Sequence, residues 1–329
     1  MSTMSLTEIM DKAIEALKKY IKTIITFNLA YGVLCFIGII GAIIVGGVLV
    51  AIALGLNLSP ALLVILSSII GIGIFTFIMS FKIGLIKISS QEFLEVRIYA
   101  SQAVGASFKN FFAVLGVILM EMVLFLPILG VFAAIGYVFY NRLQQPLLWF
   151  GMYDNYGIST IILMIIFALL LIISVLAYIT IFSFSFHAVA LENKGVFAAL
   201  KRSYNLIKGD YFKILGCTIL FNLSVYAIIY SLQSFFGVVA SVVFMILEFL
   251  NIQQDFMSFA TMAYNYSSWP ISILSWLVIS PIGTIMLTYL YYNQRFKKEG
   301  YDITLRLNKI QKCEEKEQLC ESTQYNDSI

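Results

Sequence analysis

The sequence predicts an all-α membrane protein: a polytopic bundle of six transmembrane helices, built from three helical hairpins that each follow a cytoplasmic amphipathic helix. Composition is the first observation behind this prediction. Of the 329 residues, 60% are hydrophobic and 12% are charged, with a mean hydropathy of +0.92. Soluble domains carry roughly 45–50% apolar and about 25% charged residues. The other two observations are the long charge-free runs and the placement of the basic residues.

The charge-free runs locate the spans. The run between Lys22 and Lys82 holds 59 residues, which is enough for two helices of about 20 residues each joined by a turn at residues 57–60. Four further runs are each expected to hold one helix, and Glu121 is the only charge inside them: 110–141, 155–191, 214–247 and 256–294.

The basic residues orient the bundle. Of the 21 lysine and arginine residues, all except Arg142 fall in the N-terminal segment, the second and fourth loops and the C-terminal tail. Cytoplasmic loops carry the excess of lysine and arginine. We therefore expect a multi-pass protein with both termini in the cytoplasm. A net charge of +3 is too small to indicate nucleic acid as a partner.

Amphipathic segments precede the hairpins. Ser5 and Glu8 form a capping-box pattern, and apolar residues then recur at helical spacing as far as Ile21. Similar segments lie near 92–109 and at 194–208, where Gly209 is a stop signal. The predicted organisation is a cytoplasmic amphipathic helix (1–22), a transmembrane domain with two interfacial helices (23–296) and a charged cytoplasmic tail (297–329).

Two placements of these amphipathic helices agree with the sequence. They could lie at the inner headgroup level, where anionic lipid attracts each lysine or arginine by about 1 kcal/mol. They could instead pack against the helix ends as a cytoplasmic cap. The expected partners are the bilayer, anionic lipid at the cytoplasmic face and a partner membrane protein.

Two stretches resemble a known family. The first reads ENKGVFAALKRSY at 192–204 and continues as KGDYF at 208–212, and the second reads YYNQR at 291–295, followed by EGYD at 299–302. These stretches are similar to the bacterial membrane domain that is fused to some glycerophosphoryl diester phosphodiesterases and also occurs alone. Asn293 stands where the family usually has aspartate, so no role that needs that carboxylate is transferred.

The resemblance implies a stand-alone membrane domain of the bacterial cytoplasmic membrane. The family's phosphodiesterase activity belongs to a separate soluble barrel, which holds a divalent metal with histidines and carboxylates. The residues after the sixth span are too few for such a barrel, and His187 is the one histidine. We therefore expect no enzyme activity and no cofactor or metal site.

Two polar residues inside or beside the spans are candidate functional residues. Glu121 lies 12 residues after Lys109, which is about 18 Å along a helix. An ionisable group at that depth is often functional, or it is a hydrogen-bonded structural residue. His187, five residues before Glu192, suits an interfacial hydrogen bond better than a metal site, which needs several converging ligands. Asn28 and Asn222 are expected to bond between helices.

Charged residues near the cytoplasmic ends of the spans form a candidate interface or packing motif: Lys201, Arg202, Arg295, Glu299 and Asp302. Three functions remain open. The sequence favours a non-enzymatic accessory module that interacts with lipid or a partner. The alternatives are a transporter or exporter component with Glu121 in the path, and an intramembrane enzyme acting on lipid headgroups.

Overall fold

The computed structural model describes residues 4–56, 59–143, 155–250 and 255–301, together with 303, 304 and 307. Every regular element in this part of the chain is helical. In chain order the elements are α1 (Leu6–Gly55), α2 (Pro60–Ser89), α3 (Gln91–Leu94), α4 (Ala100–Lys109), α5 (Phe111–Leu143), α6 (Asn155–Phe182), α7 (Ser185–Glu192), α8 (Val196–Ile207), α9 (Tyr211–Phe249), α10 (Phe256–Leu274), the π-helical turn η2 (Ser275–Ile279) and α11 (Ser280–Glu299).

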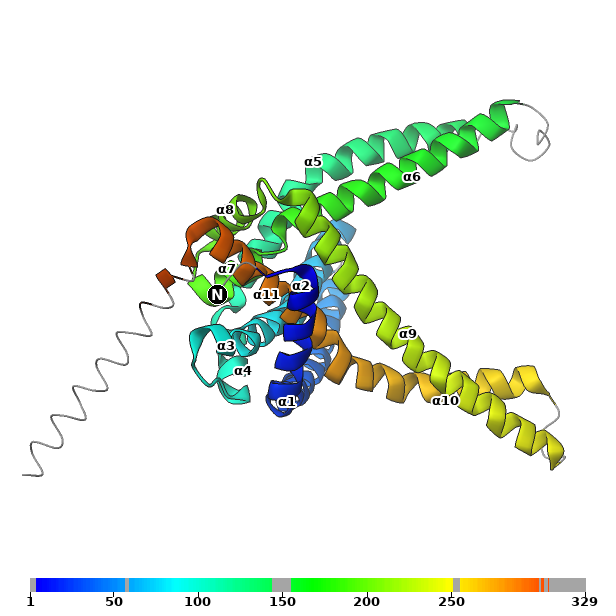
Figure 1. Cartoon of the computed structure of the whole chain (residues 1–329). Coiled ribbons are helices and arrows are strands. Elements are labelled where there is room, and N and C mark those ends of the chain that lie inside the picture. The colour runs from blue at the N-terminus through cyan, green and yellow to red at the C-terminus, as the bar shows by residue number, and fades with distance from the viewer. Residues whose placement is uncertain are drawn as a thin grey trace, which may run out of the picture. The chain divides into compact units, whose positions relative to one another are not determined.

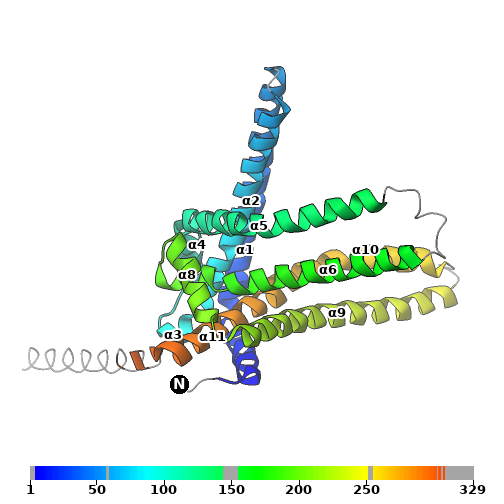
Figure 2. The same cartoon turned by 90° about the horizontal axis from the view of Figure 1, so that it is seen from above.

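Within the described ranges, six helical stretches are long and apolar enough to cross a membrane, which agrees with the predicted number of spans. They form three antiparallel pairs: α1 with α2, α5 with α6, and α9 with α10 (Figures 1 and 2). Most apolar side chains of these helices are exposed, as in the segment 161–173 of α6. A lipid-facing surface needs this arrangement, because lipid tails are as apolar as the side chains they meet.

The chain divides into two compact units. Unit 1 comprises residues 1–109 and 219–329, and unit 2 comprises residues 110–218.

An aromatic cluster forms the core of unit 1 where α1, α2, α4 and η2 meet. Phe27 and Tyr31 of α1 are 0% and 1% exposed. The Phe27 ring stacks on Phe81 of α2 with centroids 5.2 Å apart, and Phe81 stacks in turn on Trp276 at 6.0 Å. Gly84 of α2 faces Phe27 so closely that a Cβ there would lie 2.2 Å from the ring. The absent side chain therefore lets α1 and α2 approach.

A second aromatic group in unit 1 joins α3 to α11. Phe93 stacks on Tyr292 with a centroid distance of 4.0 Å and meets Tyr289 edge-on at 4.9 Å. The Tyr289 hydroxyl donates to the Glu92 carboxylate, and Ser89 donates to the Thr288 hydroxyl at 2.9 Å. These contacts hold α3 and the end of α2 on α11.

The core of unit 2 lies where α8 covers the ends of α5, α6 and α7. The face of α8 that carries Ala199, Ser203 and Leu206 is buried. At the start of α8, Val196 packs on Gly116 of α5, where a Cβ would lie 2.5 Å from a Val196 methyl group. Two placements were expected for the amphipathic segments. The buried face of α8 shows the second of them, packing against the helix ends as a cap.

The N-terminal amphipathic segment and the first span are one continuous helix. The 50-residue α1 crosses residue 22 without a break, so the expected boundary between 22 and 23 lies inside a helix. Ser5 accepts a hydrogen bond from the Glu8 main-chain N–H at 3.2 Å, which confirms the predicted N-cap. The segment expected near 92–109 forms two helices, α3 and α4, and Gly209 with a φ of +94° follows α8 as predicted.

Candidate functional site

Glu121 lies in α5 against α6. The hydroxyl of Tyr178 on α6 donates a hydrogen bond to the main-chain carbonyl of Glu121, and the Tyr178 ring lies 4.9 Å from that of Phe125. Tyr178 therefore ties the two helices of this hairpin together at the position of the carboxylate. Neither of the two pockets described below is lined by Glu121.

His187 is a buried residue of α7 with 2% of its surface exposed. Its ring stands edge-on to Phe184, with a centroid distance of 5.9 Å and an interplanar angle of 85°. In the part of the chain that the structure describes, no group of three or more histidine, cysteine, aspartate or glutamate side chains could hold a metal ion. The ring packs in the core of unit 2.

Glu192, at the end of α7, binds two cations. Its Oε1 accepts from Nε and Nη2 of Arg202 at 3.0 and 2.9 Å, and its Oε2 lies 2.9 Å from Nζ of Lys194. Asn193, with a φ of +50°, ends α7 and reverses the chain, a left-handed conformation that asparagine adopts more readily than most residues. The charge-assisted hydrogen bonds between Glu192 and Arg202 thus join α7 to α8 across the short connection at Asn193.

The exposed side of α8 carries a stripe of alternating aromatic and basic side chains. Phe197 and Tyr204 are 70% and 50% exposed, and Lys201 and Lys208 are exposed between and after them. Phe197, Lys201 and Tyr204 follow one another at intervals of four and three residues, so they lie on one face of α8, and Lys208 follows directly at the C-terminal end of the helix. We call Phe197, Lys201, Tyr204 and Lys208 the aromatic–lysine stripe. Lys201 and Arg202, expected as one motif, thus have different surroundings: Lys201 faces outward and Arg202 binds Glu192.

Arg295 and Glu299 form an ion pair one turn apart on α11, with Nε and Oε2 3.2 Å apart. The Arg295 guanidinium also lies over the Tyr301 ring, 3.6 Å from its centroid. Such a stacked and paired arginine holds the end of a helix in place. Asp302, the last residue of the expected motif, lies outside the described residues, as do residues 308–329 of the expected tail.

A cavity between α9 and α10 contains the polar residues that charge counting did not single out. It has a volume of about 510 Å³, and Gln233, Ser234, Ser267 and Ser268 contribute to its wall. The signal was present in the sequence as uncharged polar residues within two otherwise apolar runs. Polar side chains within a span are often functional, so this cavity is a candidate binding site.

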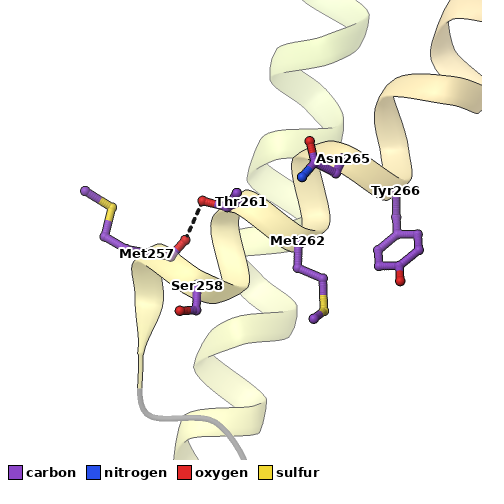
Figure 3. Close-up of a pocket in the computed structure, with 6 residues that line it drawn as sticks. All are labelled: Met257, Ser258, Thr261, Met262, Asn265 and Tyr266. Carbon is purple, nitrogen blue, oxygen red and sulfur yellow. Dashed lines mark hydrogen bonds between the residues drawn. The ribbon is translucent and has the colours of Figure 1, made fainter.

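A shallower pocket lies on the side of α10 alone (Figure 3). The Thr261 hydroxyl donates to the Met257 carbonyl within this surface. Asp255 caps the helix just before the pocket, and the hydrogen bond from the Ser258 hydroxyl, with those from the main-chain N–H groups of residues 257 and 258, holds its pKa below the usual value. The lining residues are Met257, Ser258, Thr261, Met262, Asn265 and Tyr266.

Comparisons with protein-family models, with curated proteins and with solved structures gave no match to this chain.

Proposed function

We propose that the chain is a non-enzymatic accessory module of the bacterial cytoplasmic membrane that binds anionic lipid headgroups on the aromatic–lysine stripe of α8. The observation that carries the proposal is the pattern of the stripe itself. Aromatic side chains favour the headgroup level because one part of the ring system is apolar and another is polar. Lysines at the same level attract anionic lipid by about 1 kcal/mol each.

The opposite face of α8 supports this function because it is already occupied. It packs on the ends of α5, α6 and α7 and so fixes the direction in which the stripe points. Arg202, which could compete for an anion, is held by Glu192. One face of α8 therefore caps the helix ends, and the opposite face is available to contact lipid.

The ionisable side chains at the helix junctions support the non-enzymatic part of the proposal. Glu192 holds Arg202 and Lys194, Glu92 accepts from Tyr289, and Arg295 holds Glu299. Groups tied in this way stabilise packing, since general acid–base catalysis needs a group within reach of a substrate proton. The resemblance of residues 192–212 and 291–302 to the phosphodiesterase-associated membrane domain supports a place in that family.

Native mass spectrometry of the full chain with phosphatidylglycerol and phosphatidylcholine tests the proposal. We expect the Lys201→Ala/Lys208→Ala variant to lose about tenfold to thirtyfold in affinity for phosphatidylglycerol, with phosphatidylcholine binding unchanged. The matched control, Lys297→Ala/Lys298→Ala, removes the same charge from exposed positions of α11. An equal loss in both variants would show that net charge, and not the stripe, recruits the lipid.

A further inference from the structure

The cavity between α9 and α10 lies in a hairpin whose helices are in ring contact next to the connecting loop. There Phe244 of α9 contacts Phe256 and Phe259 of α10, with ring centroids 5.1 and 5.3 Å apart. Along the cavity the facing residues are small, such as Gly237 and Ala263. Small residues usually let two membrane helices touch, whereas here the space between them remains open. Its volume of about 510 Å³ lies in the range of small-molecule sites, roughly 300–1,000 Å³.

The wall of the cavity combines apolar and uncharged polar side chains. Near the loop, Phe256 and Phe259 line the cavity together with Ser241. Farther from the loop, Gln233, Ser234 and Ser267 line it together with Phe236 and Ile271. A cavity lined by both kinds of side chain, with its amide and hydroxyl groups gathered near Gln233, fits an amphiphile. The cavity lies in two runs that contain no charged residue, 214–247 and 256–294, which is the composition of membrane-spanning helices, so a lipid is the ligand that surrounds it.

The polar groups near Gln233 offer hydrogen bonds that other described residues do not use. No hydrogen bond joins the Gln233 amide or the Ser234 hydroxyl to another residue in the described ranges. Ser267 instead donates to the Tyr264 carbonyl at 3.3 Å. A glutamine amide in an apolar medium is costly without partners, and it can both donate and accept. The complementary ligand therefore carries an acceptor and a donor close together.

Charge selects among lipids with these groups. None of the lining residues that the structure describes is Lys, Arg, Asp or Glu, and burying a charged headgroup without a partner is expensive. A neutral glycerolipid with a free hydroxyl and an ester carbonyl meets all three requirements, since the carbonyl accepts from the Gln233 amide and the hydroxyl donates to it.

We propose that the cavity between α9 and α10 binds a lipid of the diacylglycerol type, with its head on Gln233. This site goes beyond the proposed function, because it lies on other helices than the stripe and takes a neutral lipid. Failure of one proposal leaves the other unaffected.

Photolabelling with a diacylglycerol that carries a diazirine on its acyl chain tests the site in the full chain, reconstituted in phosphatidylcholine nanodiscs. We expect labelled peptides from α9 and α10, and competition by unlabelled diacylglycerol but not by added phosphatidylcholine. Gln233→Leu should lower the labelling about threefold to tenfold, the effect of one net hydrogen bond. Ala240→Phe should abolish it by filling the cavity.

Val242→Phe is the matched control, because it adds the same ring to α9 at an exposed position that does not line the cavity. Labelling in this variant should equal that of the unmodified chain. Labelling spread over all six spans, equal competition by phosphatidylcholine, or an unchanged signal in Ala240→Phe would each overturn the proposal. The competition uses the unmodified chain, so it decides the question even where a variant does not fold.

Discussion

Asn28 of α1 donates a hydrogen bond from Nδ2 to the main-chain carbonyl of Leu277 in η2, with the two atoms 2.8 Å apart. That carbonyl is the one that residue 281 would bond in a regular α-helix, and residue 281 is proline, which has no N–H to donate. The preceding turn widens to a π-helix, in which the Ser280 N–H bonds Ser275. Asn28 thus supplies the donor that the proline removes, as interhelical asparagines do in membranes.

Replacing Asn28 with leucine should therefore destabilise unit 1. Asn28 is 0% exposed, and the substitution leaves the buried Leu277 carbonyl without its donor, at a cost of about 1–3 kcal/mol. Unfolding by SDS in mixed micelles measures the change. Asn265→Leu, at an exposed position on α10, should change the free energy of unfolding by less than about 0.5 kcal/mol. Equal effects at both positions would remove the special role of Asn28.

A methyl group at Gly84 should also destabilise the protein. The added Cβ would lie 2.2 and 2.5 Å from Phe27 ring atoms and 2.9 Å from Oγ of Ser107. Gly84→Ala should cost about 1–3 kcal/mol through overpacking. Gly71→Ala on the same helix has no atom within 4 Å of the new Cβ and should stabilise by up to about 1 kcal/mol. Thermal unfolding of the pair in one detergent checks the opposite signs.

The spans could be predicted because a single property, the absence of charge, determines them. Local signals were equally reliable where one short stretch defines the geometry. Ser5 caps α1, and Gly209 has the positive φ that a residue following a helix often needs. Counting charges does not detect uncharged polar residues. It treated Gln233 and the serines near it as parts of apolar runs, so the cavity between α9 and α10 was missed.

Contacts between distant residues could not be predicted from one sequence. Met4 and Asn293 are 289 positions apart and bond each other, and no spacing rule reaches that far. Glu192 was recognised as the boundary of a span, whereas its pairing with Arg202 crosses a chain reversal at Asn193. Helical i,i+4 rules apply within one helix, so they detect the Arg295–Glu299 pair and not this one.

The protein should be more stable with Asn293 than with the aspartate that is usual at this position in the family that the sequence resembles. Its Oδ1 accepts from the Met4 N–H at 2.9 Å, and its Nδ2 donates to the Met4 carbonyl at 3.1 Å. Asn293→Asp loses the second bond and places a carboxylate against a carbonyl oxygen, at a cost of about 1–3 kcal/mol near neutral pH.

The pH dependence identifies the cause of that loss. Burial and the facing carbonyl disfavour the charged carboxylate in the folded chain, and protonation of the new carboxyl removes this penalty. The folded state then binds more protons, and the destabilisation shrinks as the pH falls. Thermal unfolding across acidic and neutral pH, relative to the unmodified chain, measures this trend. Asn293→Leu has no group to protonate, and a similar trend in that variant would refute the explanation.

The Glu192–Arg202 pair should show a measurable coupling energy. The side chains of Glu192 and Arg202 are 12% and 18% exposed, and Lys194 pairs with the other carboxylate oxygen of Glu192. In a double-mutant cycle with Glu192→Gln and Arg202→Gln, we expect a coupling of about 1–3 kcal/mol, because a shielded charge pair is only weakly screened. The exposed pair of Glu8 and Lys12 on α1 is the matched control and should give about 0.3–0.5 kcal/mol. A coupling energy between Glu192 and Arg202 no larger than that of the control would mean that this ion pair does not stabilise the contact between α7 and α8.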